Sequence, residues 1–474
     1  MNDVSILQSN LQTRFKSRSM GLKLIVVCGL ALLMTIPAFF VGGLVDDRSK
    51  RAEDVVKEIG GYVGGQQTFL GPTLAIPYSI PAKKKDDSPE YGVYLVFPAH
   101  AAADVKLTTE ERRRSLFKVP VFHADLKFNA LFDLSGVPAA APENAVLDWN
   151  RAEFVIGVSD VRGAQFDTTL TAGGKISTLI PAQVSSSMTV GQSQENFQTQ
   201  PVNLTLLGAR AADIAKPNAQ FSVSSTLRFS GAQRIAILAY GKTTNLSMQG
   251  DWPSPGFDGG FLPINRTITP KGFSADWSVP FIARGVRAEG TIGSITGLEA
   301  TALGVSFVEV ADPYQSVNRA LKYVLLFLGL LFLSYFIFEV TTRKRVHPAQ
   351  YLLVGMAQII FYLLLLSFAE RIGFDFAYLL AGGATVALFS FNAAWIFASR
   401  LQGLRALLCF SLLYSLIYLL LRLEDNALLV GAVASFLAVA AAMYFTRKID
   451  WYSSLPASGQ PEEPQPSVVP KSGV

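Results

Sequence analysis

Long apolar runs and short alternating runs divide this chain into two kinds of segment. Six runs have the length, or nearly the length, of an apolar helix that crosses a hydrocarbon core of about 30 Å. They lie at residues 24–44, 323–340, 351–368, 376–398, 406–421 and 427–445. One run precedes a long gap and five follow it, so the pattern predicts an α-helical transmembrane bundle of one plus five spans.

The gap between the first two runs has the pattern of short strands. Segments such as YGVYLVF, VFHADLKFNALFDLSG and RIAILAY are separated by Gly, Pro, Asn and Ser, which predicts a large, mainly β domain. The polar segment after the first span predicts a helical continuation that ends at a glycine cluster. Asp312 as an N-cap and Pro313 as the first helical residue predict a helix that runs unbroken into the second span.

The predicted elements divide the chain into five parts. These are an N-terminal segment at 1–23, a membrane anchor at 24–44, the mainly β domain at 45–320, the five-span bundle at 321–446 and a Pro-rich, disordered tail at 447–474. The first apolar run is longer than the core of a signal peptide, and no clear A-x-A cleavage site follows it. We therefore expect an uncleaved anchor.

Basic residues flank alternate ends of the predicted spans. They are Arg14, Lys16, Arg18 and Lys23, then Arg343, Lys344 and Arg345, then Arg400 and Arg405, and finally Arg447 and Lys448. Because positively charged loops stay in the cytoplasm, this distribution predicts cytoplasmic termini and a β domain in the bacterial periplasm. Cys28 and Cys409 both lie in predicted spans, so the β domain has no disulfide, which is compatible with a periplasmic domain of this size.

Composition indicates a membrane protein and argues against one class of partner. The 474 residues are 50% hydrophobic and only 16% charged, which is too apolar for an ordinary soluble protein of this length. The net charge of +5 does not indicate nucleic-acid binding, because residues 46–312 carry 25 basic and 27 acidic residues, a net charge of −2, and the remainder carries +7. We therefore expect the lipid bilayer as a partner and no nucleic acid.

One candidate chemical pair lies in the alternating run RSLFKVPVFHADLKF. His123 and Asp125 share the strand face opposite Phe122 and Ala124. Such a pair could orient an imidazole for base catalysis or bind a metal, but the chain has three histidines, no external cysteine and no H-E-x-x-H, G-x-S-x-G or Walker A motif. We therefore favour a solvated or groove-facing strand surface, assign no catalytic residue and expect no metal or other cofactor.

The segment GDWPSPGFDGGFLP is a second candidate. Asp251 and Asp258 could act as the two carboxylates of a glycosidase that cleaves peptidoglycan. Trp252, Phe257 and Phe261 could form a binding platform or pack into a core, and packing is the preferred interpretation. The candidate periplasmic surface therefore comprises His123, Asp125, Trp252, Phe257 and Asp258.

Polar residues in or beside the predicted spans are candidates for transport chemistry, because ionisable groups are costly in a bilayer. Glu339 lies at the cytoplasmic end of the second span, where we expect it to reach water and to pair with Arg343 one helical turn later. Asn392 lies inside the fourth span. An ion-paired rim is expected at the external membrane boundary, formed by Glu370, Arg371, Arg422, Glu424 and Asp425.

A series of segments between Gly64 and Tyr452 resembles one protein family. The series includes GGQQTFLGPTLAIPY, VPVFHADLKF, DWPSPGFDGGFLP, DPYQSVNRALKYVLLFLGLLFLSYFIFEV, HPAQYLLVGMAQIIFYLLLLSFAERIGFDFAYLLA and DNALLVGAVASFLAVAAAMYFTRKIDWY. In this order the segments are similar to the bacterial inner-membrane family CreD. The resemblance implies a large periplasmic domain and an association with cell-envelope integrity, colicin tolerance and a two-component regulon. It implies no enzymatic reaction and no catalytic residue.

Three hypotheses about function remain open. The preferred one is a non-enzymatic envelope-integrity protein whose β domain binds an envelope protein, a lipid or peptidoglycan, because the external domain is large and catalytic motifs are absent. The second is a transporter or lipid-handling protein that uses the five-span bundle. The third is a periplasmic hydrolase that uses Asp251, Asp258 or the His123 pair.

Overall fold

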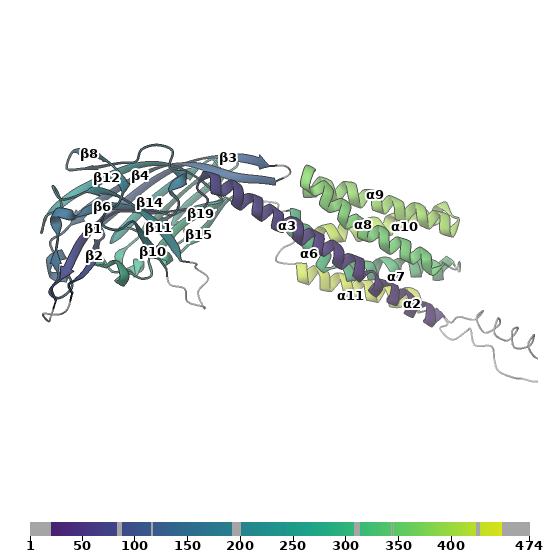
Figure 1. Ribbon diagram of the computed structural model, residues 1–474. Helices are drawn as coiled ribbons and strands as arrows, with labels where there is room; N and C mark the ends of the chain where they lie inside the picture. Colours follow the sequence, from purple (N-terminus) through teal and green to yellow (C-terminus); the bar gives the residue numbers. More distant parts are fainter. Residues whose placement is uncertain are drawn as a thin grey trace, which may run out of the picture. The chain divides into compact units, whose positions relative to one another are not determined.

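The computed structural model describes residues 20–82, 88–114, 117–191, 201–307, 313–342, 344, 346–422 and 427–447. The chain forms two compact units, and Figure 1 labels many of their elements. One unit comprises residues 51–310 and consists mainly of β-strands. The other comprises residues 1–50 and 311–474, and its described elements are helices.

An eight-stranded sheet in the β unit is built around two long strands of one hairpin. In order across the sheet its strands are β16 (Asn265–Thr269), β17 (Gly272–Val279), β14 (Thr243–Gly250), β3 (His100–Arg114), β4 (Phe117–Asp133), β12 (Gln220–Ala232), β7 (Thr169–Ala172) and β8 (Lys175–Thr178). Strands β3 and β4 pair from His100 opposite Leu131 to Arg114 opposite Phe117. All neighbours are antiparallel except β14 and β3, which are parallel.

An eleven-stranded sheet is the second layer of the β unit. Its main path is β10 (Ser187–Val190), β11 (Val202–Arg210), β6 (Glu153–Val158), β1 (Gln67–Ile80), β13 (Arg234–Leu238), β19 (Ala302–Phe307) and β15 (Pro255–Gly259), and the branches are β2 (Glu90–Val96), β5 (Val146–Leu147), β9 (Ile180–Pro181) and β18 (Glu289–Thr291). The pairing of β1 with β6 shifts register between Leu70 and Thr73. Gly71 lies at this shift, and glycine is required there because a Cβ atom would approach the Tyr240 ring to 2.7 Å.

Short helical elements connect the strands of the β unit. They are α4 (Val137–Ala140), α5 (Phe281–Arg284) and the 3-10 turns η1 (Trp149–Arg151), η2 (Val161–Gly163), η3 (Ile292–Ser294) and η4 (Leu298–Thr301). Asp160 caps η2, because its carboxylate accepts a hydrogen bond of 2.9 Å from the Arg162 amide and also pairs with the Arg162 guanidinium. The hydrogen bond from the Arg162 side chain is the main reason that the pKa of Asp160 lies below its usual range.

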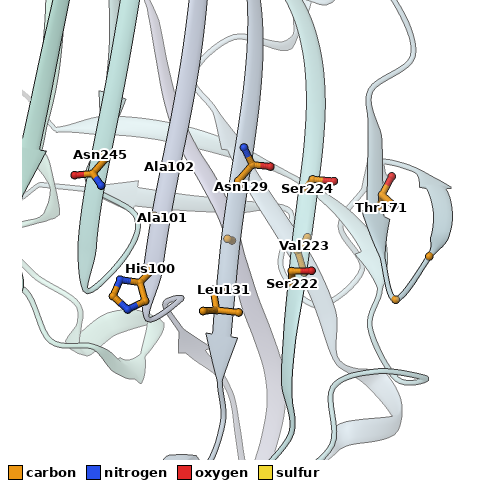
Figure 2. Close-up of a pocket in the computed structure, with 13 residues that line it drawn as sticks. His100, Ala101, Ala102, Asn129, Leu131, Thr171, Ser222, Val223, Ser224 and Asn245 are labelled. Carbon is orange, nitrogen blue, oxygen red and sulfur yellow. The ribbon is translucent and has the colours of Figure 1, made fainter.

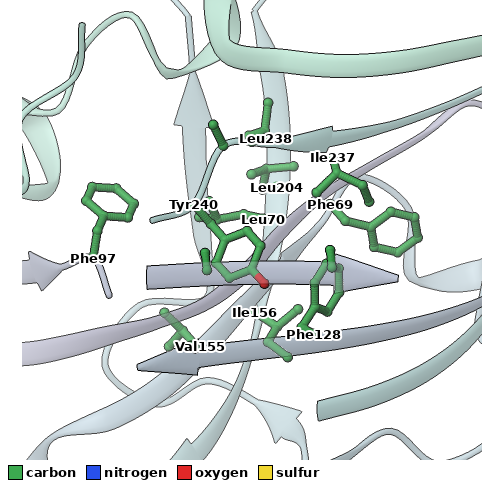
Figure 3. Close-up of a cluster of buried hydrophobic side chains, with 14 of the residues drawn as sticks. Phe69, Leu70, Phe97, Phe128, Val155, Ile156, Leu204, Ile237, Leu238 and Tyr240 are labelled. Carbon is green, nitrogen blue, oxygen red and sulfur yellow. The ribbon is translucent and has the colours of Figure 1, made fainter. Parts of the chain in front are cut away.

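Apolar side chains from both sheets form one core in the β unit, part of which Figure 3 shows. Phe69 of β1 contacts Phe229 of β12 edge-to-face, with 5.3 Å between the ring centroids. Tyr240, which follows β13, donates its hydroxyl to the carbonyl oxygen of Ala102 in β3 at 2.7 Å. Each contact joins one sheet to the other, so the two sheets pack face to face as a sandwich.

Strand β4 alternates as its sequence predicts. The side chains on one face are fully buried, namely Phe122, Ala124, Leu126 and Phe128. The side chains on the other face are half-buried or exposed, namely His123, Asp125 and Lys127. Burial of a large apolar side chain contributes about 1.5–3 kcal/mol. A one-residue shift in register would expose the whole apolar row, so this pattern specifies the register of β4 strongly.

The second unit is a bundle of helices, most of which are apolar. They are α2 (Met20–Leu33), the first part of α3 (Thr35–Val63), α6 (Pro313–Lys322), α7 (Val324–Thr342), α8 (Pro348–Ile372), α9 (Phe374–Phe397), α10 (Arg400–Arg422) and α11 (Ala427–Thr446). Within the described ranges, five helical segments are long and apolar enough to cross a membrane: Lys23–Val63, α7, α8, α9 and α10. The sixth predicted span corresponds to α11. The predicted combination of a transmembrane helical bundle and a mainly β domain is therefore confirmed.

The helices that adjoin the β unit in the sequence agree with the prediction at one end and differ at the other. Helix α3 ends directly before Gly64, which has a φ of +97°, so the glycine cluster terminates the helix as predicted. The prediction of an unbroken helix into the second span is wrong, because a turn at Tyr323 separates α6 from α7. The Tyr323 amide bonds to the Ala320 carbonyl, three residues back rather than four. Asp312, the predicted N-cap, lies outside the described residues.

Small residues and aromatic rings together fill the interior of the bundle. A Cβ atom at Gly403 of α10 would lie only 2.8 Å from the Cβ of Ala394 in α9, so the two backbones approach closely there. Tyr335 of α7 stacks on Phe410 of α10, with 5.5 Å between the ring centroids. Its hydroxyl donates to the carbonyl oxygen of Phe389 in α9 at 3.1 Å. These contacts hold α7, α9 and α10 together.

Candidate functional sites

His123 lies on the outer face of the eight-stranded sheet, among polar partners from neighbouring segments. The Gln165 amide nitrogen lies 2.6 Å from His123 Nδ1 and acts as the donor, so the proton of a neutral ring is on Nε2. His123 Nε2 lies 3.8 Å from Glu110 Oε1 of β3. Glu110 also accepts a 2.8 Å hydrogen bond from Arg112, which is the main reason that the pKa of Glu110 lies below its usual range.

Asp125 shares this face with His123 but has a different partner. Its carboxylate pairs with the guanidinium of Arg228 in β12, and that guanidinium also lies 5.3 Å from the centre of the Phe166 ring. The structure therefore does not join His123 and Asp125 as an imidazole and its orienting carboxylate. Among the described residues, no group of three or more His, Cys, Asp or Glu side chains could hold a metal ion. The geometry indicates a surface of separate polar pairs.

A hollow of about 470 Å³ lies further along the same sheet face (Figure 2). Its polar side chains come from β3, β4, β7, β12 and β14, and they are His100, Asn129, Thr171, Ser222, Ser224 and Asn245. None of the six side chains hydrogen-bonds to another described residue. The hollow thus presents hydrogen-bond donors and acceptors that no other described residue engages, together with the apolar surface of Leu131.

Sequence reasoning did not identify this hollow, although part of the signal was present. Alternation in β4 places Asn129 on the same face as His123, and alternation in β12 places Ser222 and Ser224 on its outer face. The alternation does not indicate that β12 pairs with β4, or that β14 lies parallel to β3. These pairings, together with that of β7 and β12, bring the six polar side chains together.

The aromatic residues of GDWPSPGFDGGFLP pack against the core of the β unit. The Trp252 ring lies edge-to-face on Phe307 at 5.9 Å, and the Phe257 ring contacts Trp277 at 6.0 Å. The carbonyl oxygen of Phe261 accepts a hydrogen bond of 3.0 Å from the Trp277 indole. The rings of Trp252, Phe257 and Phe261 are therefore partly buried and packed against the core rather than arranged as an open platform.

The two carboxylates of this segment serve different strands. Asp251 Oδ1 accepts hydrogen bonds from the Thr109 amide at 2.8 Å and the Thr109 hydroxyl at 2.7 Å, which ties the segment to β3. Asp258 of β15 pairs with Arg234 of β13 at 2.7 Å, in the other sheet. Both carboxylates thus have structural partners, and their placement does not favour the paired carboxylates of a glycosidase.

The predicted rim residues form separate contacts within the helical unit. Glu370 accepts a hydrogen bond of 3.0 Å from the Tyr314 hydroxyl, and Arg48 lies 4.0 Å away. Arg422 pairs instead with Asp375. Of the other predicted rim residues, Arg371 is exposed, and Glu424 and Asp425 lie outside the described residues. The structure therefore does not bring Glu370 and Arg422 together.

Glu339 has an environment that differs from the expectation. We expected it to reach water, but the residue is only 2% exposed. Its carboxylate pairs with Lys23 of α2 and accepts hydrogen bonds of 3.0 Å from both the Val346 amide and the Tyr351 hydroxyl. Lys23 also donates to the Val346 carbonyl at 2.7 Å. Val346 and Tyr351 thus help to enclose the carboxylate, and the expected partner, Arg343, lies outside the described residues.

Other polar side chains inside the bundle bind one another. Asn392 donates to the Tyr335 hydroxyl at 3.2 Å. Gln358, which the sequence interpretation did not single out, is 1% exposed and accepts a hydrogen bond of 2.5 Å from the Tyr414 hydroxyl. The Gln358 Nε2 atom has no hydrogen-bond partner among the described residues. The signal in the sequence is a polar glutamine inside a predicted apolar span, because a polar side chain in a bilayer usually faces the interior of the bundle.

Comparison with known proteins places the chain in a family. The family model described as "Inner membrane protein CreD" matches residues 19–452. The inner membrane protein CreD of Escherichia coli strain K12 is 31% identical over 449 residues, which cover 92% of this chain and 94% of that protein. The match includes both the β unit and the helical unit described above. The chain therefore belongs to the CreD family of inner membrane proteins.

Proposed function

We propose that this protein maintains the cell envelope without catalysing a reaction, and that its β domain lies in the periplasm and binds a hydroxyl-rich envelope component. The observation that carries this proposal is the hollow on the eight-stranded sheet, whose six polar side chains have no partner among the described residues. We take the glycan strand of peptidoglycan as the ligand.

The chemistry of the hollow favours such a ligand. Amide groups of Asn129 and Asn245 and the hydroxyl groups of Ser222 and Ser224 each both donate and accept hydrogen bonds, as sugar hydroxyl groups do. The lining contains no Asp, Glu, Lys or Arg side chain, so the hollow is not built to select a strongly charged ligand. Its volume of about 470 Å³ lies within the range of roughly 300–1,000 Å³ that is typical of small-ligand sites.

The distribution of positive charge supports the proposed orientation. Lys23 precedes the apolar part of the first span, and Arg400 and Arg405 lie at the start of α10. Arg447 follows α11. Alternation of the spans brings these four residues to one side of the membrane, which the positive-inside rule makes the cytoplasmic side. The β unit, which is inserted between the first span and α6, then lies on the periplasmic side.

The test uses the full chain with two changes in the hollow, Asn129→Ala and Asn245→Ala. Loss of two side-chain hydrogen bonds predicts about tenfold weaker co-sedimentation of the detergent-solubilised protein with purified peptidoglycan. In a deletion strain, the same variant should permit more leakage of a periplasmic enzyme at normal membrane abundance. The matched control is Asn265→Ala with Gln249→Ala, two exposed positions of the same sheet outside the hollow. Equal binding and equal leakage for both variants would contradict the proposal.

Transport or lipid handling by the bundle is the second candidate function. The ion pair between the buried Glu339 and the partly buried Lys23 favours it, because charged groups inside membrane proteins often mark a pathway for an ion or substrate. Replacement of both residues by uncharged side chains separates the two functions. If the doubly substituted protein inserts normally and the cells that carry it still retain their periplasmic enzymes, transport through this pair is contradicted.

A further inference from the structure

A groove with one polar end lies between α7, α10 and α11 in the helical unit. Its volume is about 540 Å³. On α10 its lining extends from Gln402 to Leu416, or roughly 20 Å at 1.5 Å per residue. On α7 it extends from Thr341 to Leu330. The groove therefore follows the helix axes over more than half of the thickness of a hydrocarbon core.

Polar and apolar groups are separated along this groove. Thr341, Gln402 and Arg405 lie where α7 ends and α10 begins, whereas leucines such as Leu330 and Leu416 line the opposite end. Two polar side chains lie between the ends, but they are satisfied locally. Ser334 donates to the Leu330 carbonyl at 2.8 Å, and Cys409 lies 3.7 Å from the Ser334 hydroxyl. Thr341 likewise donates to the Ile337 carbonyl at 2.7 Å. Gln402 and Arg405 are therefore the polar lining side chains without a hydrogen bond to another described residue, and both lie at one end of the groove.

Arg405 is the charged group at that end. It is exposed and makes no hydrogen bond, ion pair or ring contact with another described residue. No acidic side chain is among the described residues that line the groove. An arginine at the membrane boundary without a counter-ion among the described residues favours an external anion, and its planar guanidinium can bind a phosphate through two hydrogen bonds.

We propose that this groove binds one anionic phospholipid. Arg405 and Gln402 hold the phosphate headgroup, and an acyl chain lies along the leucines of α7 and α10 in the same leaflet. The cation at one end complements an anionic headgroup, and the apolar lining runs along the helix axes, as an acyl chain in the bilayer does. The two features together favour a lipid over a free anion. The proposal does not depend on the ligand of the β domain.

Native mass spectrometry of the full chain in detergent tests the proposal. With phosphatidylglycerol and the zwitterionic phosphatidylcholine at equal concentration, the wild-type protein should retain phosphatidylglycerol preferentially. Arg405→Ala should reduce that retention about tenfold. Arg400→Ala is the matched control, because it removes the same charge from the same end of α10 without changing the lining of the groove. It should retain the wild-type preference.

A second pair of variants tests the acyl-chain part of the groove without altering charge. Leu412→Trp introduces an indole into the lining, whereas Leu408→Trp does so one turn earlier on α10, outside it. Both leucines are exposed, at 75% and 65%, so both variants should fold. Only Leu412→Trp should weaken lipid retention. Equal retention of the two lipids by the wild-type protein, equal effects of Arg405→Ala and Arg400→Ala, or equal effects of the two tryptophans would overturn the proposal.

Discussion

At the scale of single residues, the most consequential contact is the buried pair of Lys23 and Glu339. The two side chains are unequally placed, because Glu339 is enclosed whereas the Lys23 side chain keeps 20% of its surface exposed. Tyr351 and the Val346 amide also donate to the carboxylate. Loss of the lysine therefore leaves a buried negative charge, whereas loss of the carboxylate leaves a cation that can still reach polar surroundings.

We predict that Lys23→Met costs more stability than Glu339→Gln. Removal of one partner from a buried ion pair typically costs about 3–5 kcal/mol of unfolding free energy. We expect a smaller loss for Glu339→Gln, because the lysine that remains is partly exposed. The double variant should lose less free energy of unfolding than the sum of the two single variants. Unfolding in mixed micelles, followed by tryptophan fluorescence, measures this coupling. Strictly additive losses would show that the two charges do not interact.

Asp160 provides a pH-dependent test within the β unit. Its pKa in the folded protein is depressed because Arg162 hydrogen-bonds to the carboxylate. A depressed pKa contributes stability above the unfolded value of about 3.9, and this contribution is lost as the pH falls through the folded pKa. We predict that Asp160→Asn lowers the melting temperature at pH 7 and that the difference from wild type narrows as the pH falls below 4. A difference that stays constant down to pH 3 would exclude a charge effect.

Among the strands and helices, sequence periodicity assigns each side chain to one face of its element. Strand pairing and helix packing then decide which side chains of different elements lie together. The outer face of β4 was predictable from alternation, but the hollow at its end depends on β12 and β14. The apolar character of α9 and α10 was equally predictable. Their close contact depends on Gly403, where the absence of a side chain lets α10 approach Ala394.

Gly403→Ala should destabilise the helical unit. The added Cβ would lie 2.8 Å from the Cβ of Ala394, which cannot rotate away, so the helices must separate at a cost of about 1–3 kcal/mol. Gly383→Ala is the control on α9, because no atom lies within 4 Å of the added Cβ there. Thermal unfolding of both variants in the same detergent gives the comparison. A lower melting temperature for Gly383→Ala than for Gly403→Ala would contradict this account of the packing.

At the scale of the whole molecule, the order of the units along the chain and the charges beside the spans suggest which side of the membrane each part occupies. The β unit is inserted between the first span and the helices that follow residue 311. The proposed orientation places this insertion in the periplasm and both termini in the cytoplasm. A hollow that binds peptidoglycan requires this orientation, because the ligand is confined to the periplasm.

Cysteine labelling tests the orientation. In a background with Cys28 and Cys409 replaced by alanine, Ile176→Cys on the exposed surface of β8 should react with a membrane-impermeant maleimide in spheroplasts. Ser454→Cys in the C-terminal segment should react only after lysis. The opposite pattern would reverse the proposed orientation and exclude peptidoglycan as the ligand of the β unit.

The apolar spans, the mainly β character of the insertion and the two faces of β4 could all be predicted from the sequence, because each depends on local periodicity against an apolar or aqueous surrounding. The folded structure is needed to show that Lys23 is the partner of Glu339, 316 positions away, and that six polar side chains without a hydrogen bond to another described residue meet in one hollow. Local pattern specifies which face of a helix or strand is buried. It does not specify which distant segment covers that face, since this depends on strand order, register and the fit of side chains across the interior.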